Sequence, residues 1–236
     1  MTDFVNLCNV NDAISVTEYI GKLQQGLHPA SFSKRFYQIR RFLKFIHLDY
    51  LNEVRIPKAQ YTRPKIVNDS DVRLLLNYLY EKDMKHFARL KAFVLIMATS
   101  GMRDKEAFQL TLSDLDLLNN KIYVRCDKNH TQKTGQERIV FITDNAKHCL
   151  EKYIKQNKNR KLFNQSTLTR AFNKAPIRMK DLRKYFSSEW IRRNGNQAVK
   201  EIIMGHSING NVDLQHYLAL SEKDLYEVYR KVMEQA

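Results

Sequence analysis

Apolar residues recur at helical spacing along the first fifty positions of the chain. The stretch "SVTEYIGKLQQGL" predicts an amphipathic helix over residues 15–27, which ends near Gly26 with Pro29 just beyond it. Residues 31–48 predict a second helix. Its apolar stripe comprises Phe32, Phe36, Ile39, Phe42, Phe45 and Ile46.

A new pattern begins after residue 68. Asp69 or Ser70 can cap a helix over residues 71–83, and the strongly apolar residues 86–101 predict a helix that ends at Gly101. The runs "KIYVRC" and "ERIVFIT" are β-rich and flank the polar "DKNHTQKTGQ", which predicts a hairpin. The rest of the chain after this hairpin again shows apolar residues at helical spacing. We therefore expect a mainly α protein with a small β-sheet, an α+β fold.

Composition agrees with this fold class. Glycine (7) and proline (4) are scarce among the 236 residues, and 43% of the chain is hydrophobic, which is enough for a real core. Cys8, Cys126 and Cys149 are widely spaced and form no CxxC pair. This spacing favours reduced thiols over a disulfide framework or a zinc site.

The net charge of +15 points to a polyanionic partner. An acidic membrane surface is the rival partner. However, the chain has no long apolar span, and no charged-then-apolar leader opens "MTDFVNLCNV". We expect a cytoplasmic protein that binds nucleic acid.

Positive charge is concentrated in residues 31–66, where only Asp49 and Glu53 oppose it. A solvated basic helix face is the common explanation of such a run, but the size of the excess favours contact with phosphates. The residues expected to bind DNA are Lys34, Arg35, Arg40, Arg41, Lys44, Arg63 and Lys65.

Five further polar residues carry little information one by one. Arg103 could pair with Glu106 on the surface, and Lys133, Lys180 and Arg183 could be solvated. His206 could simply be packed or cap a helix end. Their order along the chain is more specific: "ATSGMRDKEAFQLTLSDLDL", "KTGQERIVFI", "KDLR", "IIMGHS" and then a tyrosine.

In this order the segments resemble the catalytic domain of the tyrosine recombinases, the phage-integrase family. The family's first box, TGxRxxEhxxLxxxDhD, is matched by Thr99, Gly101, Arg103, Glu106, Leu110, Asp114 and Asp116, with Ser100 inserted. Lys133 stands five residues before Arg138, as the family's hairpin lysine does before a strand arginine, and Arg183 precedes His206 by a separation typical of the family.

The resemblance covers about residues 68–230 and implies a domain organisation. Residues 1–54 would form a short helical core-binding domain that contacts DNA, and residues 55–67 a basic linker with two prolines. Residues 68–236 would form the catalytic domain, with a C-terminal helix over residues 221–234 capped by Ser221.

The resemblance also implies site-specific DNA recombination, in which Tyr217 attacks a phosphodiester to give a 3′-phosphotyrosyl intermediate. Arg103 and Arg183 would clamp the phosphate, and Lys133 would protonate the leaving oxygen. His206 would hydrogen-bond a nonbridging oxygen, and Glu106 would orient the basic side chains.

Two positions depart from the family pattern. Lys180 replaces the commoner histidine, so it would act mainly through its charge. Tyr217 follows His206 slightly farther on than is usual. The lysine in the "KDLR" segment and the "HYL" surroundings of Tyr217 both look like archaeal and archaeal-virus integrases. Tyr226 and Tyr229 fall within the terminal helix, where we expect aromatic packing.

No cofactor is expected, because the sequence has neither an HxxEH-type metal spacing nor a GxxxxGK loop. The expected partners are double-stranded DNA with specific sites and other copies of the chain, which would form a tetramer. Leu225, Val228, Val232 and Met233 could dock on a neighbour or on their own domain.

Three alternatives stay open. A non-catalytic DNA-binding protein could share the fold, and a type IB topoisomerase shares the arginines, lysine and tyrosine. An RNA-binding or membrane-surface protein would explain the charge, but not the order of the segments.

Overall fold

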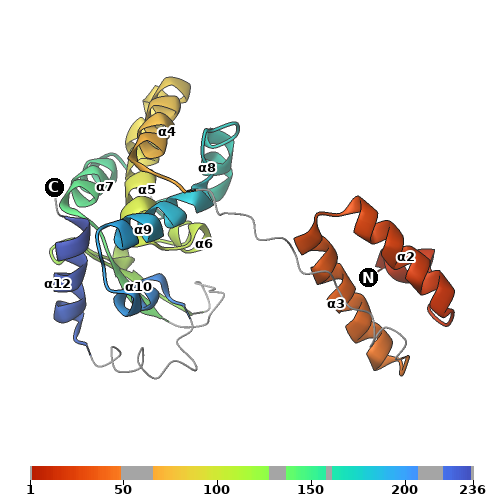
Figure 1. Cartoon of the computed structure of the whole chain (residues 1–236). Helices are drawn as coiled ribbons and strands as arrows, with labels where there is room; N and C mark the ends of the chain where they lie inside the picture. Colours follow the sequence, from red (N-terminus) through yellow and green to blue (C-terminus); the bar gives the residue numbers. More distant parts are fainter. Residues whose placement is uncertain (1, 49–65, 128–136, 158–160, 207–219, 235–236) are drawn as a thin grey trace. The chain divides into compact units, whose positions relative to one another are not determined.

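The computed structural model describes residues 2–48, 66–127, 137–157, 161–206 and 220–234 (Figure 1). It divides the chain into two compact units, Met1–Pro64 and Lys65–Ala236. Four residues expected at functional positions lie outside the described ranges: Arg63, Lys65, Lys133 and Tyr217. Of the expected linker over residues 55–67, the structure describes only residues 66 and 67.

The described residues of the N-terminal unit, 2–48, form three helices: α1 (Thr2–Leu7), α2 (Ala13–Gly26) and α3 (Pro29–Phe45). Asp12 accepts hydrogen bonds from the first backbone amides of α2, and Pro29 provides the first residue of α3. The unit has its own apolar core. It consists of Phe4, Cys8, Val16, Ile20, Phe32, Phe36, Ile39 and Leu43.

The predicted apolar stripe of α3 includes Phe45, which is exposed, and omits Leu43, which is buried. The buried residue after Ile39 is Leu43, four positions on, whereas Phe45 is 80% exposed. The prediction for Phe45 was wrong because a period of 3.6 residues turns that position away from the face that Phe36 and Ile39 share. The opposite side of α3 is basic: Lys34, Arg35, Arg41 and Lys44 are exposed and Arg40 is half-buried.

The C-terminal unit is mainly helical with a three-stranded antiparallel sheet in the order β1-β2-β3. Its elements are α4 (Asp69–Lys82), η1 (Met84–His86), α5 (Phe87–Ser100), α6 (Asp104–Ala107), η2 (Leu112–Asp114), β1 (Leu115–Asp116), β2 (Lys121–Val124), β3 (Arg138–Phe141), α7 (Asp144–Gln156), α8 (Gln165–Ala171), α9 (Met179–Arg192), α10 (Gln197–Met204) and α12 (Glu222–Met233). The predicted α+β class is confirmed.

Helix α5 forms the centre of this unit. It packs against α7 and α9, which flank it in Figure 1. Its residues are apolar on nearly every side, which is why it is buried rather than amphipathic. Its predicted end at Gly101 is confirmed, because that glycine adopts the left-handed conformation that closes a helix.

Helix α4 begins at Asp69, two residues before the predicted start at residue 71. Its cap is Asn68, not Asp69 or Ser70: the Asn68 side chain accepts from the Asp71 amide (3.1 Å), and the Asp71 carboxylate accepts from the Asn68 amide (3.1 Å). This reciprocal pair satisfies two amides that a helix start otherwise leaves unpaired, so it outweighs a single-sided cap.

The predicted hairpin is confirmed by β2 and β3, which pair antiparallel with Ile122 opposite Val140. Strand β1 adds a short third strand that the sequence did not indicate, since two residues carry no detectable period.

The C-terminal helix α12 packs on its own unit. Ser221 caps it as predicted, and Tyr229, Val232 and Met233 are buried, while Leu225 and Val228 pack partly buried against the same core. The Tyr229 hydroxyl donates to the Thr99 carbonyl (2.9 Å), which ties this helix to the end of α5. The apolar stripe of α12 was expected to dock either on a neighbouring copy or on its own domain. In the structure it packs on its own unit.

Candidate active site

Two left-handed glycines create the framework of the candidate site. Gly101 ends α5 and Gly205 ends α10, each with φ of 65°. A Cβ atom at Gly101 would overlap the Phe186 ring, and one at Gly205 would lie 2.8 Å from Arg138 Cδ. Glycine is therefore required at both turns, and both expose a carbonyl group next to the site.

Arg103 and Arg183 link these two turns. Arg103, which precedes α6, donates from Nη2 to the Gly205 carbonyl (3.2 Å). Arg183, in the middle of α9, donates from Nη1 to the Gly101 carbonyl (2.5 Å) and from Nη2 to the Met204 carbonyl (2.8 Å). The bonds bring together side chains that lie 80 positions apart in the sequence (183 − 103). Neutral carbonyls hold the guanidinium groups in place without cancelling their charge.

Glu106 provides the carboxylate of this cluster. Its side chain is only 3% exposed and binds Arg103 Nη1 (2.8 Å) and Arg138 Nη2 (2.6 Å). Burial by itself would raise the pKa of Glu106, but the hydrogen bonds and charge of Arg138, and then those of Arg103, lower it below the ordinary value of 4.5. Glu106 is thus an ionised carboxylate shared by two arginines.

Arg138 was not identified as a site residue from the sequence, where it served only to locate Lys133. It opens β3 and donates from Nε to the Ile203 carbonyl (3.0 Å) as well as binding Glu106. The β2–β3 hairpin is therefore anchored directly to the site. The position of Arg138 at the start of a predicted strand was the sequence signal that could have identified it.

Burial and, after it, the nearby charge of Arg103 lower the pKa of Arg183 from its ordinary 12.5 to about 10. The group remains protonated at neutral pH. Like charges repel, so crowding arginines here makes an added anion favourable.

His206 completes the cluster, and its protonation follows from its partners. Its Nε2 lies 2.9 Å from Arg183 Nη2, and its Nδ1 is hydrogen-bonded to Glu201 Oε2. Because a guanidinium donates and never accepts, Nε2 accepts and the proton sits on Nδ1, facing Glu201. Glu201 was missed in the sequence because a carboxylate five residues before a histidine has no fixed meaning until a helix end brings them together.

The remaining expected residues lie less centrally or beyond the described ranges. Lys180 is exposed at the second position of α9, one turn before Arg183 and on a similar side of the helix. Lys133 and Tyr217 belong to residues 128–136 and 207–219, of which nothing is described.

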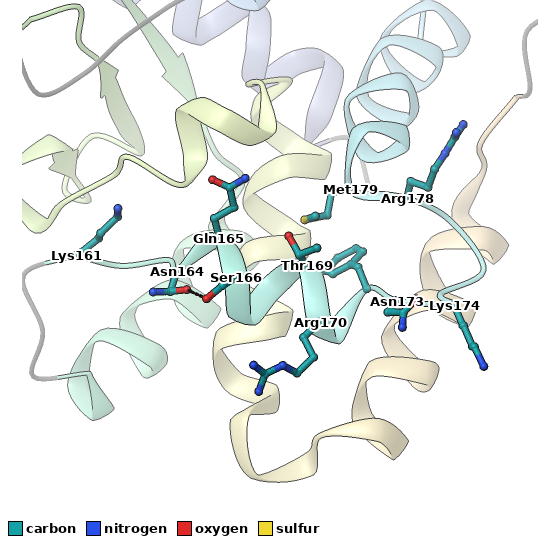
Figure 2. Close-up of a pocket in the computed structure, with 11 residues that line it drawn as sticks. Lys161, Asn164, Gln165, Ser166, Thr169, Arg170, Asn173, Lys174, Arg178 and Met179 are labelled. Atoms are coloured by element: carbon teal, nitrogen blue, oxygen red, sulfur yellow. Dashed lines mark hydrogen bonds between the residues drawn. The ribbon is translucent and has the colours of Figure 1, made fainter.

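A polar hollow of about 920 Å³ lies along α8, and we call it the α8 groove (Figure 2). Its lining includes Lys161, Asn164, Gln165, Arg170, Lys174 and Arg178, with no acidic side chain among the described residues. Met179, the first residue of α9, also lines it. Sequence reasoning overlooked it because these residues are scattered over several turns and loops.

Across the described ranges, no three His, Cys, Asp or Glu side chains gather in a way that could hold a metal ion. Within the same ranges no helix combines the length and apolar character that a membrane span needs.

Known proteins share both sequence and fold with this chain. The profile described as "Phage integrase family" matches residues 65–224. A tyrosine recombinase XerA from Saccharolobus solfataricus is 31% identical over 214 residues, covering 86% of this chain and 68% of the relative. A tyrosine recombinase XerD from Oceanobacillus iheyensis is 32% identical over 155 residues, covering 61% of this chain and 50% of the relative.

Solved structures show the same fold at lower identity. The integrase of transposon Tn1549, solved with circular intermediate DNA, matches with a TM-score of 0.64 at 16% identity, covering 92% of this chain and 84% of the other. The crystal structure of XerA recombinase matches with a TM-score of 0.50 at 21% identity, covering 94% and 85%. The chain therefore belongs to the phage integrase family of tyrosine recombinases.

Proposed function

We propose that this protein is a site-specific DNA recombinase that cuts and rejoins strands through a 3′-phosphotyrosyl intermediate on Tyr217. The observation that carries the proposal is the fixing of both guanidinium groups by the two glycine turns: Arg103 donates to the Gly205 carbonyl and Arg183 to the Gly101 carbonyl, with His206 against Arg183. Two guanidinium groups suited to a phosphate are thereby fixed at one place, next to His206.

The chemistry follows from the charge that develops during attack. The Tyr217 oxygen forms a bond to phosphorus, the bond to the 5′ oxygen breaks, and Lys133 gives that oxygen its proton. The nonbridging oxygens gain charge in the transition state, where Arg103 and Arg183 stabilise them. Tyr217 loses its proton to solvent, and the positive charge of Lys180 favours this loss from a phenol whose ordinary pKa is about 10.

In this scheme His206 can donate a hydrogen bond to a nonbridging oxygen only after it has gained a proton. In the structure its Nε2 accepts a hydrogen bond from Arg183 and cannot donate to an oxygen. With an added proton the ring donates from both nitrogens, and Glu201 is placed to balance the positive charge.

Two surfaces suit duplex DNA: the basic side of α3 and the α8 groove. The amide and arginine groups of the groove can bind phosphates or base edges. The N-terminal unit would then act as the core-binding domain and the C-terminal unit as the catalytic domain. We further propose a tetramer on paired sites, acting on DNA in the cytoplasm.

Mapping the covalent bond tests the proposal. Full-length protein is incubated with a nicked suicide duplex carrying its recombination site, and the DNA-linked peptide is identified by mass spectrometry. Tyr217→Phe should abolish the adduct. Tyr226→Phe is the matched control, because Tyr226 packs in α12 and its hydroxyl accepts from Asn120 (3.1 Å). An adduct that persists in Tyr217→Phe removes this residue from its role.

Plasmids with and without paired sites separate a recombinase from a type IB topoisomerase. Exchange between paired sites supports the recombinase. Relaxation of supercoils without regard to sequence, and without exchange, would support the topoisomerase instead.

A further inference from the structure

A second cationic hollow lies near the start of α5, about 20 Å along this helix from Gly101. It measures about 630 Å³, and we call it the Arg89 pocket. Its polar lining includes Lys85, His86, Arg89, Tyr153, Lys161 and Asn164. No residue discussed for strand cleavage lines it.

Arg89 is unusual within this pocket. Its Nε and Nη2 atoms are buried and have no hydrogen-bond partner in the described part of the chain. These two atoms form one edge of the guanidinium, the edge that can bind two oxygens of one anion through parallel bonds. Both atoms are closed to solvent, so the Arg89 side chain must turn towards the pocket before an anion can reach this edge. Buried donors without acceptors are rare in folded proteins, which favours such a turn.

The charge of the pocket favours an anion. Its described lining contains Lys85, Arg89 and Lys161 but no aspartate or glutamate. The nearby Asp83 is engaged by His86, whose Nδ1 lies 2.8 Å from its carboxylate. Several cations with no carboxylate between them suit a phosphate, whose charge is spread over several oxygens.

The walls of the pocket are already formed. Tyr153 donates to the Leu162 carbonyl (2.5 Å) and stacks on Phe163 at a centroid distance of 5.8 Å. The Leu162 amide in turn donates to the Leu110 carbonyl (3.1 Å), and Lys161 forms a backbone bridge with Thr111. Burial raises the pKa of Tyr153, and the positive charge of the nearby Arg89 partly opposes this effect.

We propose that the Arg89 pocket binds a phosphate group, with Arg89 as its bidentate anchor and Lys85 and Lys161 as further cationic contacts. Lys161 and Asn164 also line the α8 groove, where Figure 2 shows them beside the start of α8. The positive surface is thus continuous, and the phosphate can come from a DNA backbone lying in the groove or from free phosphate.

Inorganic phosphate provides the first test and does not depend on the proposed function. Full-length protein is melted at increasing phosphate concentration, with sodium chloride keeping the ionic strength constant. A ligand that binds only the folded state raises the melting temperature. We expect the rise in the wild type and in Arg73→Gln, an exposed arginine on α4 that serves as the charge-matched control. Arg89→Gln should show a clearly smaller rise, and what remains would come from the Arg103–Arg183 cluster, which also favours an anion.

The Arg89 Nε–H signal in a ¹H–¹⁵N spectrum gives a second readout on the wild-type protein, should Arg89→Gln fold poorly. Phosphate should shift this signal in a saturable way. An equal rise in melting temperature for Arg89→Gln and the control, or an Nε–H signal that phosphate leaves unchanged, would overturn the proposal.

Duplex binding then identifies the source of the phosphate. If the DNA backbone fills the pocket, Arg89→Gln should weaken binding about 3–10-fold and reduce the salt slope by about one relative to Arg73→Gln. If free phosphate fills it, the two variants should bind DNA alike. A wild-type protein that binds phosphate but no DNA contradicts the proposed function alone.

Discussion

The two ends of α5 hold arginines in opposite ways. Beyond its C-terminal end, Arg103 and Arg183 have donors bound to backbone carbonyls, and Arg103 also shares Glu106 with Arg138. Near its N-terminal end, Arg89 keeps one buried edge without an acceptor among the described residues. The first arrangement fixes the side chains before any ligand arrives.

This difference concerns preorganisation. Guanidinium groups held by carbonyls need no reordering when a phosphate reaches them, which is the condition for strong transition-state stabilisation. Arg89 carries an unmet hydrogen-bonding requirement, which a bound anion would satisfy. The comparison predicts that substitutions at the two ends of α5 have opposite effects on the folded protein.

The largest effect is expected from Arg183→Lys. Lysine keeps the charge but loses the planar fork that reaches Gly101 and Met204, so the phosphate clamp is displaced. We expect the single-turnover rate of covalent complex formation on the suicide duplex to fall roughly a hundredfold to a thousandfold. Arg73→Lys is the control, and a loss of less than threefold would show that charge alone suffices.

Glu106→Gln tests the neutralising side of the cluster. The substitution removes the negative charge that Arg103 and Arg138 share. The Arg138 side chain is only 8% exposed, so water can do little to replace that charge. We expect the free energy of unfolding, measured with urea, to fall by about 3 kcal/mol. Glu227→Gln, at an exposed position on α12, should change it by less than about 0.5 kcal/mol.

The pH dependence of the same variant supplies an independent check. The pKa of Glu106 is depressed in the folded state, so its stabilisation is present above the ordinary value of 4.5 and is lost as the pH falls through the folded-state pKa. The stability gap between wild type and Glu106→Gln should therefore be constant at neutral pH and should shrink in acid. A gap that widens in acid would contradict the ionised pair.

The helices of the C-terminal unit could be predicted because their signals are local. Apolar periodicity and the glycine after Ser100 determine where α5 ends, and Ser221 determines where α12 begins. The buried face of α3 was predicted less well: Leu43 and Phe45 are equally apolar, and the helical period set by Phe36 and Ile39 selects Leu43.

The candidate site was predictable only in part, for a similar reason. Arg103, Arg183 and His206 belong to an ordered set of segments, and the structure brings these three together. Arg138 and Glu201 act through contacts 32 and 5 residues away, which no local pattern encodes. The sequence could not indicate that Nε and Nη2 of Arg89 lack hydrogen-bond acceptors among the described residues, because this depends on how the folded chain packs around them.

The smallest effect, with the opposite sign, is expected from Arg89→Met. Methionine has a similar reach and no donors, so it removes the two unpaired N–H groups while still filling the space beside Tyr153. In phosphate-free buffer we expect the free energy of unfolding to stay the same or to rise by up to about 1 kcal/mol. Urea titrations of wild type, Arg89→Met and Arg73→Met, run with and without phosphate, measure this. A loss above about 2 kcal/mol in phosphate-free buffer would mean that the Arg89 edge is satisfied in the unliganded protein, and that the two ends of α5 hold their arginines in the same way.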